Sequence, residues 1–231
     1  MHMDSARASD TASTWLLAID TSTEQAGLAL TDGERTAELS WPAGRNQTVT
    51  VLPQIEQLLR LCGVELDALG AVAVATGPGT FTGLRVGLAL AKGLVLARDL
   101  PLIGVPTLDI AAAPYAASDT PVVVVLAAGR GRIVWATYGL DNVIGPRYGP
   151  VNSRVEELIV WLQDRPDVLV AGEMGRSDRV ALIAAGHERH EDGALSSRRP
   201  AALAAFGWRR WQAGDIDDAA TLAPIYLHAS R

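Results

Sequence analysis

The feature that most constrains the fold is a short segment that is apolar on both of its faces. Gly70–Ala75 (GAVAVA) contains no polar side chain, which is typical of a strand in the middle of a parallel sheet covered on both sides. Parallel neighbours in such a sheet are joined by crossovers, usually helices. Helical spacing follows at Phe81–Arg98, with Thr80 as its expected N-cap. A buried parallel strand followed directly by a helix predicts an α/β fold.

The first half of the chain predicts an antiparallel ribbon that leads into helix-linked strands. Asp32-Gly33 is typical of a hairpin turn. Together the pieces give a mixed sheet with helices on its faces. The expected elements are strands Trp15–Asp20, Gln25–Thr31 and Arg35–Trp41, helix Asn46–Cys62, strand Gly70–Ala75, helix Phe81–Arg98, strand Leu102–Val105 and helix Thr107–Ala117.

The second half repeats this order of elements without repeating the sequence. We expect a first lobe at residues 15–106 and a second at 107–231, a flexible tail at 1–14, and a C-terminal segment free to pack back on the first lobe. The expected elements are strands Val122–Leu126, Arg132–Leu140 and Ile144–Val151, a helix capped at Asn152 or Ser153 and running through Asp164, strand Val168–Ala171, helix Ser177–Ala185, a polar loop at 186–198, helix Ala201–Ala213 and an extended tail Thr221–His228.

Composition excludes several classes of protein. Hydrophobic residues make up 48% of the 231 positions and charged residues 20%, which excludes a disordered chain. The net charge of −6 argues against a protein that grips nucleic acid alone. The single cysteine, Cys62, excludes a disulfide framework and a cysteine-built zinc site. No apolar run approaches the roughly 18–20 residues of a membrane span, and no signal peptide is visible, so we expect a cytoplasmic protein without a membrane partner.

The sharpest motif is TGPGTFTGLR, between the buried strand and the following helix. Its glycines permit backbone angles closed to other residues, and amides at the helix start could hold an anion, although the GK[ST] of a Walker A loop is absent. The alternative is a tight strand-to-helix connection under close packing. The motif residues are Gly77, Pro78, Gly79, Thr80, Phe81, Thr82, Gly83, Leu84 and Arg85.

Several strings of the chain resemble the bacterial TsaB (YeaZ) family, closely over residues 15–110. This resemblance implies two RNase H-like lobes of the actin-like ATPase (ASKHA) superfamily. The strings are Leu17–Thr23 (LAIDTST), Val51–Pro53 (VLP), the glycine motif, Ile103–Thr107 (IGVPT) and Ala223–Leu227 (APIYL), the last like a terminal P-x-Y-L-R with His228 in place of arginine.

The resemblance also implies a function. Members of the family are non-catalytic partners of a TsaD catalytic subunit that makes threonylcarbamoyladenosine next to the tRNA anticodon. We therefore expect a scaffold that dimerises with a TsaD-like subunit, with a TsaE-like ATPase in the wider complex. In the absence of these partners, the chain could form a homodimer. It would meet tRNA only through the complex, and it would have no catalytic residue, cofactor or metal of its own.

The resemblance places pairing on the helices at Asn46–Cys62 and Phe81–Arg98. Gly83, Gly87 and Ala91 recur every four residues and would form a smooth strip for a partner helix, or else pack closely on the chain's own sheet. The residues expected at the interface are Leu52, Ile55, Gly83, Leu84, Gly87, Leu88, Ala91 and Val95.

The chain departs from the family where its relatives use polar groups. Gln47 stands in place of a usual histidine, and Ala127 in place of a frequent aspartate. Actin-like ATPases carry an aspartate after the first strand of each lobe, so Asp20 without a counterpart makes a poor Mg²⁺–phosphate site. The alternative function is an ATP-dependent kinase or hydrolase that uses Asp20 with the loop at Gly77 and Gly79. If Asp20 has no part in nucleotide binding, we expect its carboxylate to accept hydrogen bonds from Thr21 or Thr23 at the end of the strand.

Other candidates are weaker. His187 and His190 flank Glu188, but metal ligation would need a further ligand, so we expect a solvated loop. The absence of HExxH weakens a peptidase hypothesis. Trp208 and Trp211 are expected to pack in the core or between the lobes. Two arginine pairs are expected at the surface: Arg198 with Arg199, and Arg209 with Arg210.

Overall fold

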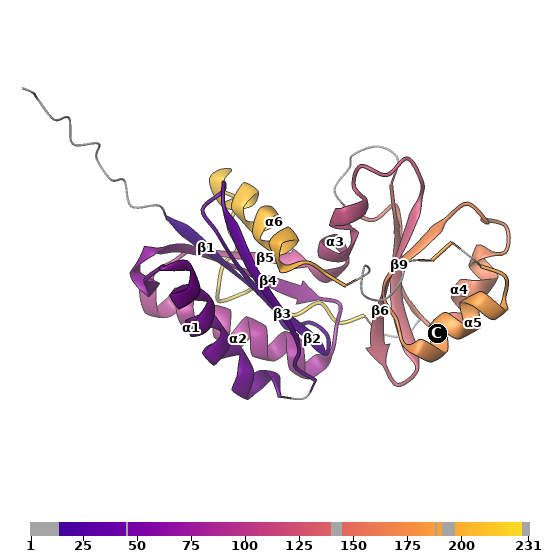
Figure 1. Ribbon diagram of the computed structural model, residues 1–231, viewed down its shortest axis with the longest axis horizontal. Coiled ribbons are helices and arrows are strands. Elements are labelled where there is room, and N and C mark those ends of the chain that lie inside the picture. The colour runs from indigo at the N-terminus through magenta and orange to yellow at the C-terminus, as the bar shows by residue number, and fades with distance from the viewer. Residues whose placement is uncertain (1–13, 45, 140–144, 188, 191–196, 228–231) are drawn as a thin grey trace, which may run out of the picture.

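Two lobes lie side by side in the computed structural model, which describes residues 14–44, 46–139, 145–187, 189–190 and 197–227 (Figure 1). The first lobe is a five-stranded sheet in the order β3-β2-β1-β4-β5. Neighbours among β1, β2 and β3 are antiparallel, whereas β4 pairs in parallel with β1 and β5. The expected mixed sheet is therefore confirmed. Its strands are β1 (Trp15–Asp20), β2 (Gln25–Thr31), β3 (Thr36–Pro42), β4 (Leu69–Gly77) and β5 (Leu102–Pro106).

Helices cover both faces of this sheet. The helices α1 (Gln47–Cys62) and α2 (Phe81–Arg98) lie on one face, and α6 (Pro200–Gln212) lies on the other (Figure 1). A short 3₁₀ helix, η1 (Leu66–Ala68), leads into β4. The late helix α6 thus belongs to the first lobe by its packing.

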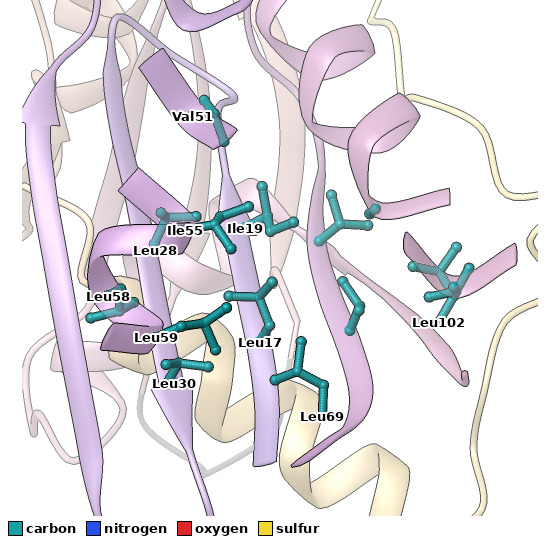
Figure 2. Close-up of a cluster of buried hydrophobic side chains, with 14 of the residues drawn as sticks. Leu17, Ile19, Leu28, Leu30, Val51, Ile55, Leu58, Leu59, Leu69 and Leu102 are labelled. Carbon is teal, nitrogen blue, oxygen red and sulfur yellow. The ribbon is translucent and has the colours of Figure 1, made fainter. Parts of the chain in front are cut away.

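The apolar β4 strand serves two cores. Val72 and Val74 face the cluster under α1 and α2, and Ala71 and Ala73 face α6. Small side chains suit the α6 face because that helix comes very close: a Cβ added to Gly207 would lie 2.5 Å from the Cβ of Ala73. Figure 2 shows the larger cluster, where leucine and isoleucine side chains of α1 interdigitate with those of β1 and β2.

The second lobe is a four-stranded sheet in the order β8-β7-β6-β9. Along β6, Val122 and Val124 face α3, whereas Val123 and Val125 face α4 and α5. Its elements are α3 (Thr107–Ala112), the 3₁₀ turn η2 (Ala113–Tyr115), β6 (Val122–Gly129), β7 (Arg132–Tyr138), β8 (Tyr148–Ser153), α4 (Val155–Leu162), β9 (Leu169–Glu173) and α5 (Arg176–Ala184).

Several expected boundaries differ from the structure, and two of them do so for identifiable reasons. The helix expected at Thr107–Ala117 leaves α geometry after Ala112, because Pro114 has no amide hydrogen to donate. The expected cap at Asn152 or Ser153 is absent because both residues still pair with β7. The helix begins one residue later, where the Arg154 amide donates to the Glu157 carboxylate at 3.0 Å.

The C-terminal segment crosses from one lobe to the other in extended form. Leu222 packs on the first-lobe cluster, and Leu227 packs on the second. We call Leu222–Leu227 the C-terminal strap; His228 and residues 1–13 lie outside the described residues. Across the described part of the chain, no helix is both long enough and apolar enough to span a bilayer.

Candidate functional site

Asp20, at the end of β1, is buried at the junction between the lobes and paired with Arg198. The side chains of both residues are 3% exposed. The Nε of Arg198 donates to Oδ2 of Asp20 at 2.8 Å, and the Ser22 hydroxyl donates to Oδ1 at 2.6 Å. Protein groups therefore engage both oxygens of this carboxylate.

Glu173, at the end of β9, brings the second lobe into the same ion pair. Nη1 of Arg198 lies 2.5 Å from Oε2 of Glu173. The Thr23 hydroxyl donates to that oxygen at 2.7 Å and accepts from Arg198 at 3.2 Å. We call Asp20, Thr23, Glu173 and Arg198 the Arg198 cluster. It joins the loop after β1, the end of β9 and the segment before α6.

Electrostatics favour the charged forms of the buried pair. Burial alone would raise the pKa of Asp20, but the Arg198 charge and hydrogen bonds from Arg198 and Ser22 outweigh burial and hold that pKa below its usual value. Burial would likewise lower the pKa of Arg198, yet the carboxylates of Asp20 and Glu173 raise it. Asp20 and Arg198 are therefore oppositely charged at neutral pH.

The residues at this junction do not fit the Mg²⁺–nucleotide site of an actin-like ATPase. Oxygen ligands are what Mg²⁺ requires, and those of Asp20 are engaged by Arg198 and Ser22. Ala127, on β6, offers no side-chain oxygen. The Arg198 guanidinium, 2.8 Å from Asp20, would also repel a metal cation. The geometry gives no support to the kinase or hydrolase alternative.

The glycine motif packs directly on the loop that follows β1. The Thr80 amide donates to the Ser22 carbonyl at 2.7 Å. A Cβ on Gly79 would lie 2.2 Å from that carbonyl oxygen, and one on Gly83 would lie 2.0 Å from the carbonyl oxygen of Thr21. Close backbone approach therefore explains both glycines, in agreement with the tight-connection interpretation.

The Gly83 and Leu84 amides, in the first turn of α2, both donate to Thr80. The expected cap is confirmed, because the Thr80 hydroxyl accepts from the Gly83 amide at 3.3 Å. The Gly77 amide donates to the Thr107 hydroxyl at 3.0 Å. The Gly77 amide is therefore already engaged within the chain and is not free to hold an anion.

The small-residue strip of α2 faces the sheet, so the expectation of a smooth outer surface is wrong. A Cβ on Gly87 would lie 2.3 Å from the hydroxyl oxygen of Thr21, the residue that follows β1. The strip is therefore small because it packs closely on the chain itself. Of the eight expected interface residues, Leu52 alone is exposed, at 49%. The buried seven are Ile55, Gly83, Leu84, Gly87, Leu88, Ala91 and Val95.

The groove between the two helices is lined mostly by residues outside that expected set, with Leu52 common to both. A groove of about 530 Å³ lies between them, and Phe81 at its wall is 55% exposed. Exposed apolar grooves are one kind of surface that receives the apolar face of a partner's helix. We call it the α1–α2 groove; it is lined by Thr48, Val51, Leu52, Phe81, Thr82, Arg85, Val86, Ala89 and Leu90.

The histidine pair shows no metal geometry. His187 is buried, so the expected solvated loop is wrong at this position. Its Nε2 lies 3.0 Å from the Val168 carbonyl oxygen. Glu188 lies outside the described residues, among which no group of three or more His, Cys, Asp or Glu could hold a metal.

The packing role expected of Trp208 and Trp211 is confirmed: their ring centroids lie 5.2 Å apart in an edge-on arrangement, against the core on the α6 side of the sheet.

Arg198 is a site residue whose burial the sequence does not predict. The sequence places it at the surface with Arg199, but only Arg199 lies there, paired with Glu38. The sequence does indicate that Asp20 needs a partner, because a carboxylate buried at the end of an apolar strand must be paired or hydrogen-bonded. Nothing in the spacing shows which arginine supplies it.

Comparisons with known proteins agree with this fold. A family model described as TsaD: tRNA N6-adenosine threonylcarbamoyltransferase matches residues 42–162, more than half of the chain. The tRNA threonylcarbamoyladenosine biosynthesis protein TsaB of Escherichia coli is 39% identical over 130 residues, 55% of this chain and 56% of that protein. This match therefore spans about half the length of the relative.

Two further relatives match over nearly their whole length. TsaB of Bacillus subtilis is 29% identical over 219 residues, 92% of this chain and 93% of that protein. The solved structure of YeaZ from Pseudomonas aeruginosa is 25% identical, with a TM-score of 0.74 over 93% of this chain and all of that one. Within the family that the matching model describes, this chain belongs to the TsaB (YeaZ) group.

Proposed function

We propose that this chain takes part in the biosynthesis of threonylcarbamoyladenosine in tRNA as a non-catalytic subunit that pairs with a TsaD-like catalytic subunit. The names of its relatives supply the process. The observation that carries the pairing is the α1–α2 groove, an exposed apolar groove within the region that the TsaD model matches. A protein of that family would carry a similar helix pair, and equivalent surfaces can pair about a two-fold axis.

The Arg198 cluster supports the non-catalytic part of the proposal. The carboxylate that could hold a metal ion is neutralised within the chain, and Ala127 offers no second one. Chemistry therefore falls to the partner, and ATP handling to a TsaE-like ATPase. The charge of −6 disfavours tRNA binding by this chain alone, so contact with tRNA would come through the complex. A homodimer through the same groove would compete with the heterodimer.

Leu52→Glu is expected to abolish the heterodimer, because it places a charge in the groove where a partner would exclude water. Light scattering after size exclusion, with purified catalytic subunit from the same genome, measures the mass of the complex. Val160→Glu is the matched control: Val160 is an exposed apolar residue on α4 of the second lobe. We expect the control to bind as the wild type does.

Two results would contradict the proposal. One is a wild-type chain that fails to form a complex at micromolar concentrations. The other is a Leu52→Glu chain that forms the complex as well as Val160→Glu does.

A further inference from the structure

We infer that the C-terminal strap is part of the partner-binding surface. It holds Phe81 and Arg85 in place at the wall of the α1–α2 groove, so that the surface receives an apolar helix of the partner together with a carboxylate that reaches Arg85. The inference rests on the proposed function and names a second contact region and its chemistry.

The strap is fixed at three points along its length. Leu222 packs against Gly104, where an added Cβ would lie 2.9 Å from its side chain. The Ile225 amide donates to the Thr76 carbonyl at 2.8 Å. The Leu227 carbonyl accepts from Nδ2 of Asn152, in the second lobe, at 2.8 Å. The segment is thus seated on both lobes.

Between these anchors, Tyr226 meets the start of α2. Its ring centroid lies 5.4 Å from that of Phe81, with the planes tilted by 31°. The Nε of Arg85 donates to the Tyr226 phenol oxygen at 3.2 Å, and the Arg85 guanidinium carbon lies 3.8 Å from the Phe81 ring centroid. Two neighbours therefore hold the exposed Phe81 ring, and an aromatic residue fixed before binding makes an effective anchor.

The charge of Arg85 indicates what the partner presents. Among the described residues, no carboxylate pairs with Arg85, and its hydrogen bond to Tyr226 uses Nε. A guanidinium has five N–H donors, so its Nη groups are left for a carboxylate at the rim. Other surface arginines, such as Arg199 and Arg210, already pair with acids of the chain.

Two substitutions test the inference through the Kd for the purified catalytic subunit, by isothermal titration. Arg85→Glu repels the expected carboxylate, and Tyr226→Ala removes the support of Phe81; each is expected to raise the Kd about tenfold or more. Tyr226→Phe keeps the ring and loses the phenol oxygen, so its effect is expected to be smaller. Both Arg85 and Tyr226 are exposed, so the melting temperature of the free chain is expected to stay unchanged.

Arg209→Glu is the matched control. Arg209 lies on α6, on the opposite side of the sheet, with its guanidinium carbon 4.9 Å from the Phe206 ring centroid. If Arg85→Glu and Tyr226→Ala bind like this control while Leu52→Glu does not bind, the inference is overturned and the proposed function stands. If the wild-type chain does not bind the catalytic subunit, the proposed function fails, and the inference fails with it.

Discussion

Replacing Arg198 by methionine is expected to lower the free energy of unfolding by about 3–5 kcal/mol, because removal of one partner leaves buried charge uncompensated. The carboxylates left behind would be those of Asp20 and Glu173, from different lobes. Urea denaturation at pH 7, followed by circular dichroism, measures the change. The neighbouring Arg199→Met is the control: its exposed pair with Glu38 should contribute no more than about 1 kcal/mol.

The Arg198 effect should also depend on pH with a definite sign. Because the pKa of Asp20 is lowered in the folded chain, its ionised form contributes stability above the usual aspartate pKa, and this contribution is lost as pH falls toward the lowered value. The stability difference between wild type and Arg198→Met should therefore stay level from pH 7 to about pH 5 and narrow below it, as pH falls through the usual aspartate pKa toward the lowered one. A difference that stays constant below the usual aspartate pKa as well would mean that Arg198 does not act through the charge of Asp20.

Gly87→Leu is the second substitution with a large expected effect. Its side chain would enter the space of the Thr21 hydroxyl, 2.3 Å from the new Cβ, and that hydroxyl donates to the Gly83 carbonyl at 2.7 Å. Overfilling a packed core costs about 1–3 kcal/mol or more, so the melting temperature should fall clearly.

Gly93→Leu is its control on the same helix. Gly93 is exposed, and nothing lies within 4 Å of an added Cβ. Removing a glycine from a helix interior favours the helix by roughly 0.5–1 kcal/mol. The melting temperature of Gly93→Leu should therefore stay level or rise. A Gly87→Leu chain that melts with the wild type would show that the strip does not pack inward.

The parts of the fold that follow local rules could be predicted from the sequence. The segment at β4, apolar on both faces, predicts a central parallel strand, and Asp32-Gly33 predicts a hairpin. The observed mixed sheet contains both. The inward face of α2 could not be predicted, because the helix is apolar almost all round: Leu84 and Leu88 are buried, whereas Leu96 is 75% exposed. Periodicity alone gives no preferred face in such a helix.

The candidate site was harder to predict because its contacts join distant segments. Arg198 reaches Asp20 across 178 positions, and Tyr226 reaches Arg85 across 141. No local pattern encodes such pairs. The resemblance of the terminal APIYL string to a family motif marked Tyr226 as part of a motif, but only the fold shows that its ring lies against Phe81.

If this chain acts by pairing with a catalytic subunit, the formation of threonylcarbamoyladenosine should depend on its presence. The catalytic subunit would be given tRNA and a threonylcarbamoyl donor, and the modified nucleoside would be measured by mass spectrometry after digestion. We expect product when the wild-type chain is added at one equivalent. We expect little product with Leu52→Glu, with the catalytic subunit alone, or with this chain alone. Equal product with and without this chain, or product from this chain alone, would contradict this pairing role.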